Sequence, residues 1–172
     1  MKILFLIFSI IVISRISIAQ TKSMSTIKGD FDGNKTKDII TIYESKPGTE
    51  LTPQLGGEAA ECKVKTSLKN IKNISLLNAC GELINEGDLD GNGTDEFSIV
   101  QRSTNGTQVY MSTYKIQKGK LVLICSPQFE PGIGTDITNK MLIGRVYKKN
   151  NRIYYIDSDA AGILTTKQVK VK

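Results

Sequence analysis

The stretch that decides the fold is Gly87-Asp88-Leu89-Asp90-Gly91-Asn92-Gly93-Thr94-Asp95-Glu96, in which oxygen-bearing side chains recur at alternate positions. A near copy stands 58 positions earlier, as Gly29-Asp30-Phe31-Asp32-Gly33-Asn34-Lys35-Thr36-Lys37-Asp38. We call residues 30–38 the first loop and residues 88–96 the second loop. Each leads directly into an apolar, β-branched segment, at residues 39–42 and 97–100. A repeat of this length indicates stacked or radial modules of a few strands each.

The spacing of the oxygens predicts one calcium site in each loop. Calcium takes roughly six to eight oxygen ligands, and a loop can wrap it with donors at every other residue. The predicted ligands are Asp30, Asp32, Asn34, the Thr36 carbonyl and Asp38 in the first loop, and Asp88, Asp90, Asn92, the Thr94 carbonyl and Glu96 in the second. The alternative is a pair of Asp-Asn-Gly turns without metal, which are common. The duplicated spacing favours calcium.

Both loops close at their ninth residue and lead into a strand. An EF-hand instead needs a bidentate acid at its twelfth position and a helix on either side. The twelfth positions here are Thr41 and Ile99, inside the strand-like segments. This arrangement resembles the FG-GAP and VCBS-type repeats of integrin-like β-propellers, over two stretches of about ten to fifteen residues each. The resemblance implies a calcium loop between two strands of a blade.

The two loops differ at their sixth position, where a turn with positive φ is favoured. The second loop has Gly93 there, and the first has Lys35. Lys35 and Lys37 also add positive charge beside the ion. We therefore expect the first site to bind calcium more weakly than the second. For both sites we expect dissociation constants of about 10⁻⁴ to 10⁻³ M, which are common for extracellular modules.

The rest of the chain is typical of short strands separated by turns, because apolar residues nowhere keep a helical spacing for three turns. The predicted strands are residues 26–28, 38–44, 62–66, 71–77, 82–85, 97–102, 107–116, 121–125, 141–147, 152–157 and 163–171. Two long loops, 45–58 and 127–136, are rich in Pro and Gly. This pattern therefore predicts an all-β class, and the resemblance to FG-GAP and VCBS-type repeats implies blade-like antiparallel sheets.

The number of repeats is too small for a closed propeller. Such a ring usually needs about four to eight blades, and the predicted mature chain holds about 2.6 repeats. A third loop would fall near residue 146, where no acid occurs, and Asp157-Ser158-Asp159 is interpreted as a surface turn. We expect one domain, residues 20–172, with repeats at about 24–44 and 82–102. It is either an incomplete propeller of two or three blades or a compact β domain, closed by its own hairpins, or it assembles with copies of itself.

The N-terminus predicts a secretory signal peptide, residues 1–19, cut before Gln20. Lys2 precedes an apolar run over residues 3–13, and Ser17 and Ala19 place small residues where a signal peptidase cuts. The alternative is a membrane anchor, but the run is shorter than the roughly 20 apolar residues that span a bilayer. We expect a protein that is secreted, periplasmic or outside the cell envelope.

The three cysteines would then face an oxidising compartment. Cys62, Cys80 and Cys125 allow one intramolecular disulfide, with three possible pairings. Cys62 with Cys80 is preferred, because they flank a predicted hairpin and are closest in sequence. A pairing with Cys125 stays open.

Composition narrows the possible activities. The chain has no His, which excludes Ser-His-Asp and Cys-His catalysis and most zinc sites. The run Asp88-Leu89-Asp90-Gly91 is similar to the motif of haloacid-dehalogenase-type phosphatases, but no βαβ alternation surrounds it. We expect a secreted calcium-binding module that binds a protein or glycan or serves structurally, and that is not an enzyme. The alternative is a hydrolase that cleaves phosphate esters or glycans through the acidic loops.

Two further groups of residues bear on partners. The net charge is +6, but the lysines are scattered, which favours a solvated surface over a nucleic-acid site. Six tyrosines could supply a binding face, although tyrosines on strands are more often packing residues. They are Tyr43, Tyr110, Tyr114, Tyr147, Tyr154 and Tyr155.

Overall fold

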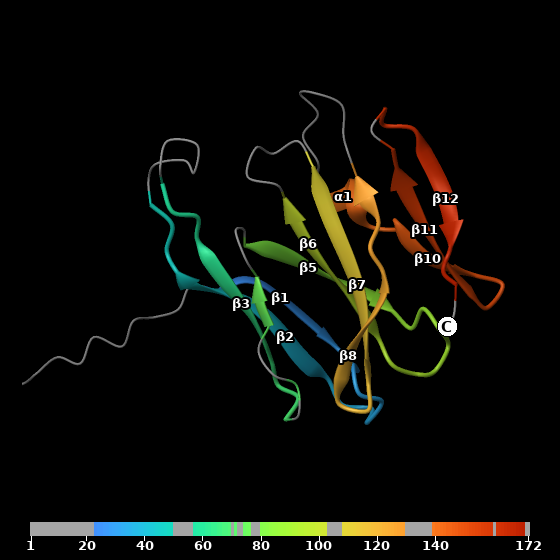
Figure 1. Cartoon of the computed structure of the whole chain (residues 1–172). Coiled ribbons are helices and arrows are strands. Elements are labelled where there is room, and N and C mark those ends of the chain that lie inside the picture. Colours follow the sequence, from blue (N-terminus) through green and yellow to red (C-terminus); the bar gives the residue numbers. More distant parts are fainter. Residues whose placement is uncertain are drawn as a thin grey trace, which may run out of the picture.

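The computed structural model describes residues 23–49, 57–69, 71, 74–76, 80–102, 108–129, 139–159 and 161–170. The predicted signal peptide lies outside these ranges, as do residues 50–56 and 130–136 of the two predicted long loops. Within them, three antiparallel sheets follow one another along the chain, and none closes into a barrel (Figure 1). The predicted all-β class is confirmed.

Each sheet is a run of sequence neighbours, as in a β-meander. The first sheet has the order β1 (Ser23–Gly29), β2 (Asp38–Lys46), β3 (Glu61–Thr66) and β4 (Ile74–Leu76). The second has the order β5 (Gly81–Gly87), β6 (Glu96–Arg102), β7 (Val109–Gln117) and β8 (Lys120–Cys125), and β9 (Gln128–Phe129) also pairs with β7. The third has the order β10 (Val146–Lys149), β11 (Arg152–Ser158) and β12 (Leu164–Gln168).

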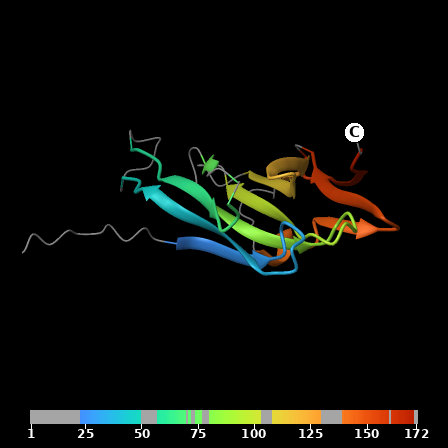
Figure 2. The same cartoon turned by 90° about the horizontal axis from the view of Figure 1, so that it is seen from below.

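The second sheet lies between the other two, as both views show (Figures 1 and 2). It therefore buries side chains on both faces, which is clearest in β6. Phe97 and Ile99 pack into a core shared with the first sheet, and Val100 packs into a second core shared with the third sheet. Two-sided burial explains why the segment after the second loop is almost continuously apolar.

The segment predicted as a strand over residues 141–147 begins instead with a helical turn, so that prediction is wrong at its start. Helix α1 spans Asn139–Leu142, and β10 begins only at Val146. Leu142 and Val146, four residues apart, are both buried in the second core. The backbone N–H of Arg145 donates to the Leu142 carbonyl at 3.1 Å, and Gly144 takes a φ of 82°, which suits glycine.

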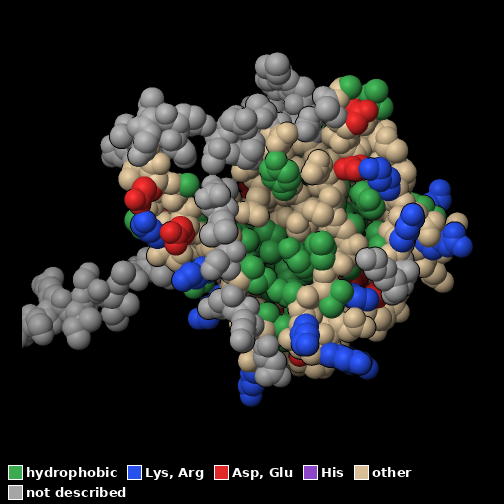
Figure 3. All heavy atoms as spheres, in the orientation of Figure 1, with side chains coloured by type: hydrophobic (Ala, Val, Ile, Leu, Met, Phe, Trp, Pro, Cys, Tyr) green, Lys and Arg blue, Asp and Glu red, His purple; other side chains and the backbone are tan. Residues whose placement is uncertain are grey.

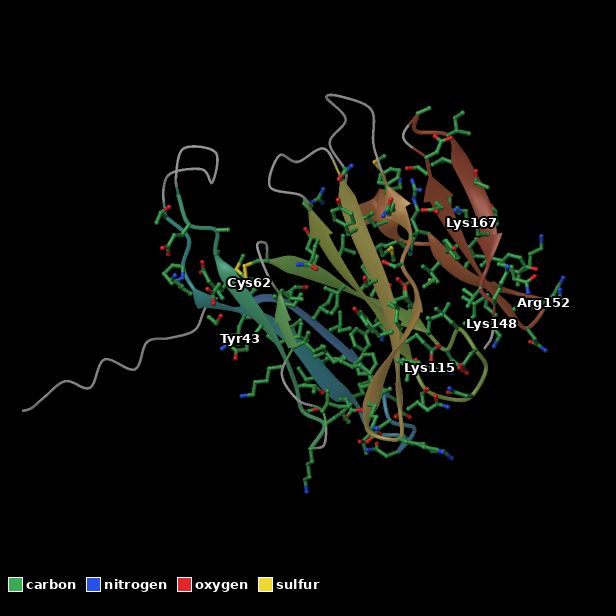
Figure 4. All side chains as sticks on the ribbon, in the orientation of Figure 1. Tyr43, Cys62, Lys115, Lys148, Arg152 and Lys167 are labelled. Atoms are coloured by element: carbon green, nitrogen blue, oxygen red, sulfur yellow. A yellow bond between two sulfur atoms is a disulfide. The ribbon has the colours of Figure 1, made fainter. Side chains whose placement is uncertain are left out.

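A disulfide joins Cys62 of β3 to Cys80, the residue before β5, with their Cα atoms 5.1 Å apart (Figure 4). The preferred pairing is confirmed, and the bridge covalently links the first sheet to the start of the second. Cys125 is a free thiol, buried at the end of β8.

The tyrosines do not share one face. Tyr114 packs against the first core and Tyr155 against the second. Tyr147 and Tyr154 stack on each other within the third sheet, with ring centroids 5.8 Å apart. The packing interpretation is therefore confirmed for Tyr114 and Tyr155.

Candidate metal centre

The two acidic loops have the same local backbone conformation. Gly33 and Gly91, the fourth residue of each loop, both have a φ of 81°. Lys35 and Gly93, the sixth residue, have φ values of 64° and 86°. The predicted positive φ at the sixth position is confirmed in both loops. Lys35 adopts it although its Cβ makes the left-handed region unfavourable.

The hydrogen bonds within the loops repeat at the same positions. Asp30 and Asp88 each accept from the backbone N–H of the fourth residue of their loop, at 2.8 and 2.6 Å, and from that of the sixth, at 2.9 and 3.0 Å. Asp32 and Asp90 each accept from the N–H of the fifth residue, at 3.1 and 3.2 Å. The repeat seen in the sequence is thus a repeat of geometry.

The acid that closes each loop reaches back to its start. Asp38 Oδ2 accepts from the Phe31 N–H at 3.1 Å, and Glu96 Oε2 accepts from the Leu89 N–H at 2.7 Å. As a result the carboxylates converge as two triads, in each of which the three oxygens lie within 4.8 Å of one another. The triads are Asp30, Asp32 and Asp38 in the first loop, and Asp88, Asp90 and Glu96 in the second.

The amide ligands are held differently. The Oδ1 atoms of Asn34 and Asn92 accept hydrogen bonds from the backbone N–H groups of Thr36 and Thr94, at 2.7 Å in each loop, and from the hydroxyls of the same threonines. These contacts hold each Asn and Thr pair together. Turns without metal also form such hydrogen bonds, so a discriminating feature has to come from elsewhere in the loop.

Glu96 supplies that feature. Its side chain is fully buried, its Oε2 accepts from the N–H groups of Leu89 and Asp90, and its Oε1 has no hydrogen-bond partner. A buried carboxylate oxygen without a partner is costly, because it has lost its water and gained nothing in return. A cation among Asp88, Asp90 and Glu96 would satisfy it.

The same burial shifts proton affinities. Burial, and then the negative charges of Asp90 and Asp88, raises the pKa of Glu96 to about 7, despite the hydrogen bonds from the Leu89 and Asp90 backbone. Burial is also the main cause that raises the pKa of Asp38. Both closing acids are therefore in surroundings that disfavour a bare negative charge, and a nearby cation would reverse this.

Two lysines beside the second loop were not predicted from the sequence. Lys115 of β7 donates from Nζ to Asp90 Oδ2 at 3.1 Å, in a partly buried ion pair. Lys148 of β10 places its Nζ 2.7 Å from where a Cβ on Gly91 would lie, and Figure 4 labels both lysines near this loop. They are distant from the loop in sequence, so no local motif could have indicated them.

Lys148 belongs to a hairpin that takes the place of a third loop. β10 and β11 are joined through Asn150 and Asn151, with φ values of 52° and 57°. This Asn pair forms a tight turn with two positive φ values, and the lack of acids in the sequence near residue 146 agrees with a hairpin in place of a third acidic loop.

A hollow of about 410 Å³ borders the first loop. Its lining includes Asp32, Asn34 and Asp38 of the loop, and the apolar residues Leu68 and Ile116. Two of the three acids of the first triad, Asp32 and Asp38, therefore line this hollow. Over the face of the molecule seen in Figure 3, lysine and arginine side chains are spread around the rim rather than gathered in one patch.

Comparison of the chain with protein-family models, with curated proteins and with solved structures finds no match in any of the three. Among the residues that the structure describes, no helix has the length and apolar character needed to cross a membrane.

Proposed function

We propose that the chain is a secreted calcium-binding β module in which each acidic loop holds one calcium ion between two adjacent strands. The observation that carries this proposal is Glu96 Oε1, a buried carboxylate oxygen without a partner beside Asp88 and Asp90. The donors are carboxylate, amide and carbonyl oxygens on a loop, which suits calcium better than a small ion that demands octahedral geometry.

The role of the ion is to brace the junctions between strands. Asp38 is the first residue of β2 and Glu96 the first of β6, and each contacts the start of its own loop. A cation held by a triad therefore ties the end of one strand to the beginning of the next. The sheets braced in this way would present a protein or glycan ligand with a stable surface, or serve structurally in a larger assembly.

Thermal melting with calcium and with chelator tests the proposal. For each site with a dissociation constant of about 10⁻⁴ M, about 10 mM calcium stabilises the folded state by about 2.7 kcal/mol, or roughly 5–10 °C per ion in a domain of this size. Calorimetric titration should show two ions per chain.

The matched variants are Asp90→Asn in the second triad and Glu82→Gln, a partly exposed acid of β5 that lies outside the loop and pairs with Arg102. We expect Asp90→Asn to lose one of the two ions and Glu82→Gln to keep both. No heat of binding, together with equal melting temperatures in calcium and chelator, would exclude the calcium sites.

The alternative, a hydrolase, has its own test. Phosphate-ester and glycan substrates should not be turned over if the loops only bind calcium. Turnover by the parent protein that disappears in Asp88→Ala would favour the enzyme instead.

Sequencing the N-terminus of protein collected outside the cell tests secretion, with Gln20 as the expected first residue.

A further inference from the structure

We propose that the two calcium sites are coupled, so that an ion in the second loop raises the affinity of the first loop for calcium through the contact between Asp30 and Asp95. This inference rests on the proposed calcium binding and adds to it an interaction between the two loops. Nothing in the sequence repeat requires such a contact, because each loop could bind its ion alone.

The loops are joined by reciprocal hydrogen bonds. The Asp95 backbone N–H donates to the Asp30 carbonyl at 2.7 Å, and the Asp30 backbone N–H donates to Asp95 Oδ2 at 3.1 Å. Asn85 steadies this contact, because its Nδ2 donates to Asp95 Oδ2 at 3.3 Å and to the Lys28 carbonyl at 3.0 Å. One carboxylate thus holds the backbone of the other loop.

The two loops are closely packed at this point. A Cβ on Gly29 would lie 2.6 Å from Asp95 Oδ2 and 2.7 Å from Asn85 Nδ2. A Cβ on Gly33, in the middle of the first loop, would lie 3.1 Å from the Thr94 side chain. The first loop therefore rests directly on the second.

The residues in this contact are adjacent to predicted ligands of both sites. Asp95 stands between Thr94, whose carbonyl is a predicted ligand, and Glu96, which closes the second triad. Asp30 is the first member of the first triad. An ion that immobilises residues 94–96 also immobilises the group that positions Asp30. Ordering a backbone costs conformational entropy, so the second ion to bind meets a loop that is already partly ordered.

Electrostatics acts in the opposite direction. A calcium ion in one loop reduces the negative potential that attracts an ion to the other. Charges in solvent are screened over about 8 Å at physiological ionic strength, and the carboxylates of each triad offset the charge of their own ion. We therefore expect the ordering effect to prevail at about 0.15 M salt, and the coupling to weaken at low salt.

Calorimetric titration measures the coupling directly. Asp90→Asn leaves only the first site and Asp32→Asn only the second, so each variant gives one intrinsic binding constant. The coupling factor is the overall two-ion constant of the parent protein divided by the product of these two constants. We expect a factor of about five to ten, a size typical of coupled sites.

Asp95→Ala removes the carboxylate between the loops without changing any predicted ligand side chain. In this background only the backbone hydrogen bond from Asp95 to the Asp30 carbonyl remains. The same three titrations should therefore give a coupling factor reduced toward one, with both ions still bound. Asn85→Ala removes the amide that steadies Asp95, along with its hydrogen bonds to the Lys28 carbonyl and the Gly87 N–H. It should give an intermediate factor and serves if Asp95→Ala folds poorly. Asp157→Ala, an acid of the third sheet, is the matched control and should leave the factor unchanged.

The outcomes separate the two proposals. A coupling factor of one or less in the parent protein at about 0.15 M salt, with both single-site variants binding calcium, overturns the coupling and leaves the calcium sites standing. The same factor in the parent protein and in Asp95→Ala overturns the assigned route. If no form binds calcium, the proposed function fails and the coupling fails with it.

Discussion

Lys115 and Asp90 form an ion pair across the second loop, with Nζ and Oδ2 3.1 Å apart. Lys115 comes from β7, while Asp90 belongs to the carboxylate triad. An ammonium group therefore lies beside a predicted calcium ligand. It offsets the repulsion among three carboxylates when no ion is bound, and it opposes the arrival of a divalent cation.

Lys115→Met should have effects of opposite sign on stability and on affinity. Without calcium, the loss of the ammonium leaves Asp90 less well compensated, and we expect the protein to lose a few tenths to about 1 kcal/mol of stability. With calcium, the variant should bind the second ion several-fold more tightly. Melting in chelator and calorimetric titration measure the two quantities.

Lys167→Met is the control, because Lys167 pairs with Asp157 in the third sheet, outside both loops. It should leave calcium affinity unchanged. If Lys115→Met binds calcium more weakly than the parent, then Lys115 serves mainly to orient Asp90 rather than to oppose the ion.

Lys35→Gly should strengthen the first site. Lys35 holds a φ of 64°, which costs about 1 kcal/mol or more for a residue with a Cβ, and its charge lies in the loop that would bind the cation. Glycine at this position would match Gly93 of the second loop. We expect both a higher melting temperature and a tighter first ion, measured by titration of Lys35→Gly in the Asp90→Asn background.

Lys37→Gly is the matched comparison, because it removes an equal charge without relieving a positive φ. A melting temperature that rises equally in Lys35→Gly and Lys37→Gly would show that charge, and not backbone strain, separates the two loops.

The loops, the strand that follows each and the disulfide were predictable because their determinants are close together in the sequence. Alternating oxygens between Asp88 and Glu96 form a local pattern, and a loop that closes on its own first residues needs no distant partner. Cys62 and Cys80 lie 18 residues apart on either side of a short strand, so a bridge between them is easily closed.

The features that were not predictable depend on which distant segments meet. Lys115 reaches Asp90 across 25 positions, and Asp95 reaches Asp30 across 65. The prediction that the first site binds calcium more weakly, which used the charges of nearby lysines, is incomplete for the same reason. Lys35 was visible as a cation near the first site, whereas Lys115 becomes one near the second only after the sheets have formed.

Stability without calcium should fall as the pH rises from about 4.5 to 7. The folded protein raises the pKa of Glu96 to about 7 from 4.5, mainly by burial, so in this window the folded state holds more protons than the unfolded one. Glu86, whose pKa burial also raises to about 7, acts in the same direction. Melting in chelator across this range measures the slope, which should be shallower in Glu96→Gln.

Calcium should reverse this dependence, because a bound cation favours the ionised carboxylate. Affinity for the second ion should then increase between about pH 6 and 8, with protons released on binding near pH 7. Titrations in buffers of different ionisation enthalpy measure the release. A calcium affinity that does not change with pH would contradict either the raised pKa of Glu96 or its role as a calcium ligand.

The cysteines should behave as two separate systems. Replacing both Cys62 and Cys80 by Ala frees a loop of 18 residues. This should lower the free energy of unfolding by about 3 kcal/mol, or the melting temperature by roughly 6–12 °C.

Cys125 is 7% exposed, and burial raises the pKa of its thiol to about 11. A thiol reagent should therefore find no reactive cysteine in the native protein and one after unfolding without reductant. Rapid reaction of the native protein would mean that Cys125 is accessible, and three thiols after unfolding would mean that the Cys62–Cys80 bridge is absent.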